Sequence, residues 1–187
     1  MLPRDAHTHR PALDALVDID PTVSPTLPDG LVCSAGIHPW RAAEAGTEAT
    51  DRLAVWASDP RVIAIGETGL DRNYPDPGRQ LELLRLHISL SEKTAKPLVL
   101  HVVRSFGQVI DLHDMLKPRQ PWIIHGFRGK PELARQLVRA GFYISFGPKF
   151  NPESLRAVPV ERRLAETDDS TLTIEEVEAL HRETMES

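Results

Sequence analysis

The chain has 187 residues, of which 41% are hydrophobic and 26% are charged, and its formal net charge is −5 at pH 7. This length and composition are typical of one globular domain, spanning residues 1–187, with a single core. The negative charge argues against a protein that coats nucleic acid, but it is compatible with an enzyme whose mouth is locally basic.

The first residues carry no apolar segment of the kind that directs export. The longest apolar runs are interrupted by histidines well before the ~18 residues that a membrane span needs. The single cysteine, Cys33, has no partner for an internal disulfide and lies in an apolar run. We therefore expect a cytoplasmic protein that does not bind membranes.

Strands and helices alternate along the sequence. The first expected strand runs into His7 and His9, and because side chains alternate along a strand, both imidazoles point to the same face. Apolar runs predict seven further strands, at residues 15–20, 31–38, 62–67, 97–103, 122–125, 142–146 and 163–168. Helices are predicted at residues 48–58, 80–95, 106–116 and 131–141, with Ser105 as a cap and a capping box at Thr173 before a last helix.

The strand at residues 62–67 ends in a carboxylate. Its apolar residues stop at Gly66, and Gly66 and Gly69 allow sharp turns on either side of Glu67. We therefore expect the Glu67 side chain at the C-terminal end of this strand. A strand end with a solvated glutamate is the simpler interpretation, but several other strands end in ionisable side chains as well.

This alternation predicts an α/β fold with parallel strands, and eight strands indicate a closed (β/α)₈ barrel. Only residues 10–14 and 21–30 join the first three strands, so we expect a compact barrel that lacks its first two crossover helices. The missing helices would leave apolar strand surface uncovered on one flank. We expect either the partner chain of a homodimer or the C-terminal helix to cover that flank.

Ionisable side chains gather at the C-terminal ends of the expected strands, where such barrels have their active sites. They are His7, His9, His38, Glu67, His101, His125 and Asp168. A lone strand histidine is usually a hydrogen-bonded core residue, but this explains the whole set poorly. Catalytic zinc needs only three protein ligands, so the set indicates two metal ions, bridged by the two oxygens of Glu67.

The order of these residues resembles the amidohydrolase superfamily, and longer motifs are similar to those of the TatD family of metal-dependent hydrolases. The motifs are Gly36-Ile-His-Pro-Trp40, Gly66-Glu-Thr-Gly-Leu-Asp71, Pro97-Leu-Val-Leu-His101, Ile124-His-Gly-Phe-Arg-Gly129 and Ala165-Glu-Thr-Asp168. The resemblance runs from Asp5 to Asp169. Residues 10–30 are much shorter than the matching segment of a usual member, and Asp169-Ser170 stands where the family commonly has Ser-Pro.

The resemblance implies a phosphodiesterase with two divalent ions. His7, His9, Glu67 and Asp168 would hold one ion, and Glu67, His101 and His125 the other. Glu67 and Asp168 are the implied catalytic residues, and Asp168 would orient the attacking water and take its proton. Zinc, manganese or magnesium could serve, and the histidines favour the first two, because magnesium prefers oxygen ligands.

Cationic side chains follow the same rim. Arg104, Arg128 and Lys149 each lie within a few residues of a strand end, and with His38 they predict a binding surface for the phosphates of a substrate. Solvated surface charge is the usual explanation for each of these cations alone. Weaker candidates for base stacking, each more simply explained by core or loop packing, are Trp40, Tyr74 and Phe127.

The leading prediction is a deoxyribonuclease, exonuclease-like by resemblance, that acts on single-stranded DNA or on strand ends. The alternative is a hydrolase of small phosphoesters, esters or amides, including a deacylase, that uses the same two ions. A noncatalytic metal-binding protein is a third class, and the complete ligand set argues against it.

Overall fold

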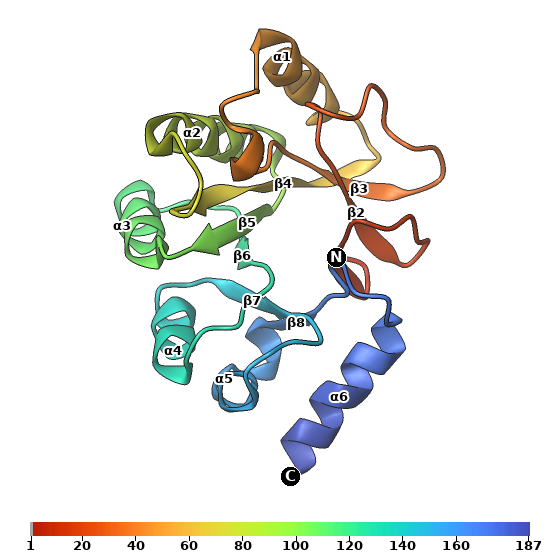
Figure 1. Ribbon diagram of the computed structural model, residues 1–187, viewed down its shortest axis with the longest axis vertical. Helices are drawn as coiled ribbons and strands as arrows, with labels where there is room; N and C mark the ends of the chain where they lie inside the picture. Colours follow the sequence, from red (N-terminus) through yellow and green to blue (C-terminus); the bar gives the residue numbers. More distant parts are fainter. Residues whose placement is uncertain (1) are drawn as a thin grey trace.

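The structure, a computed structural model, describes residues 2–187 and contains a closed barrel of eight parallel strands in chain order (Figure 1). The strands are β1 (Asp5–Thr8), β2 (Ala15–Ile19), β3 (Val32–Ala35), β4 (Val62–Asp71), β5 (Leu98–Val103), β6 (Trp122–Ile124), β7 (Tyr143–Phe146) and β8 (Arg163–Ala165). The helices are α1 (Thr47–Trp56), α2 (Pro77–Thr94), α3 (Phe106–Leu116), α4 (Pro131–Arg139), α5 (Pro152–Ala157) and α6 (Ile174–Glu186). Two short 3₁₀ helices are η1 (Pro39–Arg41) and η2 (Val160–Arg162). The predicted barrel is confirmed.

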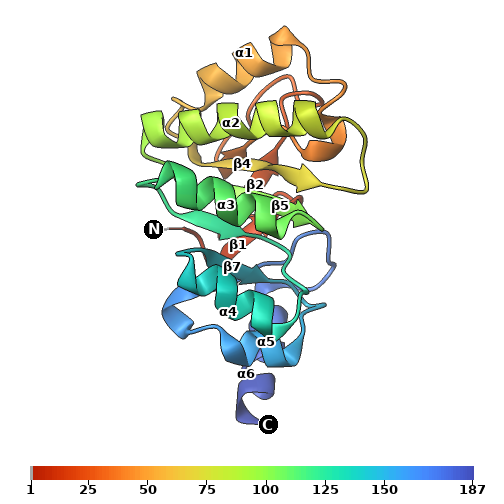
Figure 2. The ribbon, with the colours of Figure 1, turned by 90° about the vertical axis from the view of Figure 1, so that its left-hand side faces the viewer.

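Helices follow β3 to β8 but not β1 or β2. In Figure 1, α1, α2, α3 and α4 lie outside the strands in chain order, and Figure 2 shows the same helices stacked across the face of the barrel. Their apolar stripes form the main core, and Leu53, Leu84 and Leu137 from α1, α2 and α4 are fully buried. Within the described part of the chain, no helix separates β1 from β2 or β2 from β3, as predicted.

Connecting loops cover the flank that lacks helices. Leu27, in the segment between β2 and β3, belongs to the same core cluster as Val17 of β2. Arg52 of α1 donates a hydrogen bond to the Pro21 carbonyl at 2.6 Å and so ties this segment to the helix. On the outer face of β1, Ala6 is only 2% exposed. The expectation of uncovered apolar strand surface is therefore wrong. The homodimer was expected only because of that surface, so the structure does not support it.

β4 continues to Asp71 rather than ending near Glu67. Its register against β5 shifts between Ile65 and Thr68, which marks a bulge in the middle of the strand. Bulges re-aim side chains next to active sites, and this one turns Glu67 into the mouth of the barrel. Cβ atoms at Gly66 and Gly69 would collide with carbonyl oxygens of β5. The glycines therefore allow close approach of β5, and the turns predicted at them are absent.

Helix ends follow local sequence signals in most places. The capping box at Thr173 is present, and Ser105 occupies the N-cap position of α3 as predicted, although its side chain makes no capping hydrogen bond. Helix α5 was not predicted, although Asn151 caps it and Pro152 opens it. Across residues 2–187, no helix has both the length and the apolar composition that crossing a membrane requires.

Candidate metal centre

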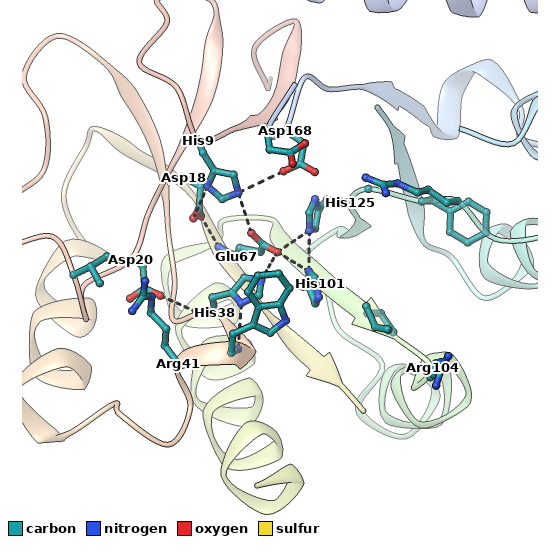
Figure 3. Close-up of a pocket in the computed structure, with 18 of the residues that line it drawn as sticks. His9, Asp18, Asp20, His38, Arg41, Glu67, His101, Arg104, His125 and Asp168 are labelled. Atoms are coloured by element: carbon teal, nitrogen blue, oxygen red, sulfur yellow. Dashed lines mark hydrogen bonds and ion pairs between the residues drawn. The ribbon is translucent and has the colours of Figure 1, made fainter. Parts of the chain in front are cut away.

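The mouth of the barrel gathers all six residues predicted as metal ligands; Figure 3 labels five of them, and the sixth, His7, lies 3.3 Å from Glu67. Glu67 lies at the centre, and its side chain is only 2% exposed. His9 and Asp168 lie on one side of it, and His101 and His125 on the other. Each of the six makes at least one nitrogen–oxygen approach of 3.4 Å or less to another member of the set. The six residues are therefore within coordination reach of shared positions.

The two oxygens of Glu67 face different histidines. Oε2 lies 3.3 Å from His7 Nε2 and 3.8 Å from His9 Nε2. Oε1 lies 2.9 Å from His101 Nδ1 and 2.7 Å from His125 Nε2. A carboxylate placed in this way can give one oxygen to each of two cations.

The closure of the barrel between β8 and β1 places Asp168. Asp5 of β1 accepts hydrogen bonds from the Thr167 backbone N–H at 3.0 Å and from the Thr167 hydroxyl at 2.6 Å. The Asp168 N–H donates to the His7 carbonyl at 2.9 Å, and Asp168 has a left-handed φ of 52°. Together these contacts bring Asp168 Oδ1 to 3.4 Å from His9 Nε2 and 3.9 Å from His7 Nε2.

Three of the histidines have a further carboxylate near their second ring nitrogen. Asp18 Oδ2 lies 3.7 Å from His9 Nδ1, Asp71 Oδ2 lies 3.3 Å from His101 Nε2, and Glu166 Oε1 lies 3.5 Å from His125 Nδ1. Metal-binding histidines usually have such a partner, which fixes the tautomer and the orientation of the ring. The arrangement is thus the one expected around ligand histidines.

These three carboxylates were not predicted as parts of the site. Asp71 and Glu166 lie within two of the TatD-like motifs, where the pattern alone gives them no role. Asp18 lies on β2 and accepts a hydrogen bond from the Glu67 backbone N–H at 2.7 Å and another from the Ser34 hydroxyl at 3.1 Å. A charged residue inside a short apolar strand was the signal that could have identified it.

Two atoms at the centre show how well the site suits a cation. His7 Nε2 and Glu67 Oε2 are buried and have no hydrogen-bond partner among the described residues. Buried polar atoms are rarely left without a partner, and an ion is one of the groups that can satisfy them. One ligand atom each from His7, His9 and Glu67 lies within 4.8 Å of the others, and the same holds for His7, His125 and Asp168. The mixture of imidazole and carboxylate groups suits zinc or manganese.

The clustered charges shift several pKa values. Burial alone would raise the pKa of Glu67, but the His125, His101 and His38 rings around it hold that pKa well below its ordinary value. Burial also opposes the lowering at Asp168, where the hydrogen bond with His9 is the main favourable contact and brings the pKa to about 2. The same hydrogen bond raises the pKa of His9 to about 9. Both carboxylates are therefore ionised at neutral pH, as metal binding requires.

His38 also touches Glu67, but its ring is bonded differently. Its Nδ1 accepts a hydrogen bond from the Trp40 backbone N–H at 3.1 Å, so the neutral ring carries its proton on Nε2. That Nε2 lies 2.9 Å from Glu67 Oε1. The His38 backbone N–H donates to Asp20 Oδ2 at 3.0 Å, which holds the residue in place. With this tautomer His38 is a hydrogen-bond donor at Nε2, although its ligand atom also lies within 4.8 Å of those of Glu67 and His101.

A cavity of about 970 Å³ opens above the cluster. Arg104 and Arg128, two of the cations predicted to bind substrate, lie in its wall. Lys149 lies instead in a small adjoining recess, together with Arg128 and Asp168. Phe127 also lines the cavity but is only 2% exposed, so it is too buried to stack on a base.

The comparisons with known proteins all point to the same family. The family model described as TatD related DNase matches residues 22–184. A protein of Buchnera aphidicola named as an uncharacterized metal-dependent hydrolase is 35% identical over 153 residues, which are 76% of this chain and 57% of that protein. A Cronobacter turicensis protein named 3'-5' ssDNA/RNA exonuclease TatD is 33% identical over 150 residues, which are 74% of this chain and 57% of that protein.

Among solved structures, the TatD homologue YJJV of Escherichia coli matches with a TM-score of 0.77. The match covers 91% of this chain and 78% of that one at 21% identity, and this likeness shows the fold. The chain spans a little over half the length of the curated relatives it matches. His7 and His9 precede the residues that the family model matches, so the structure alone places them beside the other ligand candidates.

Proposed function

The chain belongs to the TatD family of metal-dependent hydrolases, and from this we propose that it is a dinuclear phosphodiesterase that shortens single-stranded nucleic acid from an end. The observation that carries this assignment is the position of Glu67, whose two oxygens face two separate pairs of imidazole nitrogens. Relatives named as 3'-5' ssDNA/RNA exonucleases support the choice of substrate. A mouth at the end of a narrow barrel also suits a strand end better than a continuous duplex.

Each ion would have its own part of the cluster. His7, His9 and Asp168 would hold one, His101 and His125 the other, and Glu67 both. Bound divalent ions lower the pKa of water toward ~7 and neutralise charge on a phosphate. The imidazoles are the reason for expecting zinc or manganese ahead of magnesium.

The side chains around the ions divide the remaining work. Asp168, ionised because its pKa is about 2, accepts the proton of the attacking water. His38 donates from Nε2 to an oxygen of the scissile phosphate, a role for which its Nδ1 contact with the Trp40 N–H prepares it. Arg104 and Arg128 attract the neighbouring phosphates along the cavity wall.

Metal-dependent digestion of a labelled oligonucleotide tests this function. The full chain is stripped with a chelator and reloaded with zinc, manganese or magnesium, and its metal content is measured by mass spectrometry. Stepwise shortening of single-stranded DNA or RNA, with two ions per chain, is the expected result. Intact oligonucleotides alongside rapid turnover of small esters or amides would contradict it and favour a small-molecule hydrolase.

An Asp168→Asn variant separates chemistry from metal binding. The amide oxygen can still contact a cation but cannot take a proton, so we expect kcat to fall roughly 10²- to 10⁴-fold. Metal content should remain near that of the unaltered chain. Full activity in this variant would show that another group accepts the proton.

A further inference from the structure

Trp40 differs from the other two tryptophans of the chain because it lies in the open. It is 50% exposed, whereas Trp56 and Trp122 are 8% and 1% exposed within the core. It belongs to η1, two residues after His38, and lines the cavity above the metal cluster. Core packing therefore does not account for the position of this side chain beside the cavity.

The Trp40 ring is also held rigidly. Its Nε1–H donates to Asp71 Oδ2 at 2.7 Å. One face stacks on the Tyr74 ring, with the centroids 4.7 Å apart and the planes inclined by 13°. Tyr74 covers one face of the ring, and Trp40 itself lines the cavity. A ring fixed in this way loses little conformational entropy when a flat ligand binds.

The Trp40 ring lies close to the metal centre. The Trp40 ring centroid lies 4.7 Å from that of His38 and 5.7 Å from that of His101. Each of those two rings places a nitrogen 2.9 Å from Glu67 Oε1. A base stacked on Trp40 would therefore lie next to the two histidine rings that contact Glu67.

Building on the proposed function, we propose that Trp40 is the stacking platform for the nucleobase next to the scissile phosphate. Stacking on an aromatic face tolerates every base, which suits an enzyme that shortens strands regardless of sequence. The Tyr74 ring stacks on one face of this platform and supports it. Asp71 Oδ2 contacts both Trp40 Nε1 and, at 3.3 Å, His101 Nε2, so one carboxylate fixes the distance from the platform to the metal centre.

Abasic oligonucleotides test this role directly. The kcat/KM for removal of the terminal nucleotide is measured on a single strand with all its bases and on strands with a tetrahydrofuran residue at either nucleotide flanking the cleaved bond. In the unaltered chain, the base at one of these positions should raise kcat/KM roughly 5- to 150-fold, as expected for one stacked base. In Trp40→Ala, that preference should fall close to one.

A second variant separates stacking from positioning. Trp40→Phe keeps an aromatic face but loses the N–H that bonds Asp71, so it should retain most of the preference for a base. Tyr74→Ala should weaken the preference partly. Met115→Ala, an exposed position on α3 outside the cavity, is the matched control and should change nothing.

The outcomes distinguish the platform from the nuclease function. An unchanged preference in Trp40→Ala overturns the platform, and so does an equal loss in Trp40→Phe, which would show that Trp40 acts only through Asp71. If Trp40→Ala fails to fold, the Trp40→Phe and Tyr74→Ala results decide the question. An unaltered chain that leaves all oligonucleotides intact overturns the proposed function and the platform together.

Discussion

The half of the barrel formed by β1 to β3 and the half formed by β4 to β8 hold their parts of the site by different forces. In the second half, His101 and His125 follow Leu100 and Ile124, both fully buried in the main core. In the first half, β1 and β2 have loops in place of helices. There, hydrogen bonds between polar side chains and backbone position the site.

Three aspartates with little exposed side-chain surface form such contacts. Asp5 binds Thr167 across the closure, Asp18 binds the Glu67 N–H, and Asp20 binds the His38 N–H. Each carboxylate holds a specific donor at a defined distance, which apolar packing against a helix cannot do as selectively. A barrel can therefore lose crossover helices and still orient a site, provided that polar contacts take over this part of their role.

Glu67 joins the two halves, so its replacement should have the largest effect. In Glu67→Gln only one oxygen remains to face a cation, and the negative charge is lost. We expect both ions to bind weakly and kcat/KM to fall about 10³-fold or more, since each metal contributes several kcal/mol to catalysis. Metal content and oligonucleotide cleavage measure the two effects.

His7→Asn and His125→Asn are the matched variants for the two halves. Each removes one imidazole from one side of Glu67, so each should reduce the metal content by one ion and leave the other in place. Loss of both ions from either variant would show that the halves do not bind metal separately.

The next largest effect is expected from protonation of His87, and it concerns the free energy of unfolding. This buried residue of α2 accepts a hydrogen bond at Nε2 from the Ile37 N–H at 2.8 Å, and so ties the second half to the His38 segment. Burial lowers its pKa from 6.5 to about 4. The unfolded chain therefore binds a proton more readily, and the free energy of unfolding should fall by about 3 kcal/mol as the pH drops from 6.5 to 4.

Denaturant unfolding of His87→Gln at several pH values checks this contribution. The variant has no imidazole to protonate, so its stability should depend less on pH between 6.5 and 4, and it should be less stable than the unaltered chain at pH 7. Parallel curves for the two proteins over that range would contradict the assignment. Both proteins are measured with the same metal content.

Local sequence patterns predicted the strands and the side chains that lie near their C-terminal ends. Alternation placed His7 and His9 on one face, and apolar runs placed His101 near the end of β5 and His125 directly after β6. The bulge at Glu67 could not be predicted in this way, because it depends on the register between β4 and β5. A strand stopped by glycine and a strand bulged at glycine have the same local sequence.

Contacts between residues of different strands and loops could not be predicted from the sequence either. Asp18 reaches the Glu67 N–H only because β2, β3 and β4 are neighbours, and Leu27 covers Val17 only after its loop has folded back. Helix α5 is different, because Asn151 and Pro152 gave a local start signal. The first two depend on tertiary packing, whereas the third was present and was overlooked.

Replacing the carboxylates near the second ring nitrogens of the ligand histidines should have a smaller effect on metal affinity, and that effect should differ between the two halves. Asp18→Ala removes the acceptor for the Glu67 N–H, so the affinity for both ions should fall roughly 10- to 100-fold. Glu166→Ala removes a partner of His125 and of the Gly126 N–H, so only one ion should be affected. Metal titration followed by calorimetry gives both affinities.

Asp18→Asn is the matched control, because its amide oxygen can still accept from the Glu67 N–H. It should bind metal more tightly than Asp18→Ala does. Equal affinities in Asp18→Asn and Asp18→Ala would mean that the charge near His9, and not the hydrogen bond to Glu67, is what matters.

The smallest expected effect concerns how the two halves attract the substrate. Arg128, on the second half, lines the cavity without a carboxylate partner among residues 2–187, whereas Arg41, on the first half, lies 3.5 Å from Glu44. Arg128→Ala should therefore raise the KM for an oligonucleotide and reduce the slope of log affinity against log salt by about 0.7. Arg41→Ala should change both less, because Glu44 already offsets its charge. Equal slopes for the two variants would show that the rim attracts phosphates evenly, and the difference between the halves would then be limited to how they hold the metal centre.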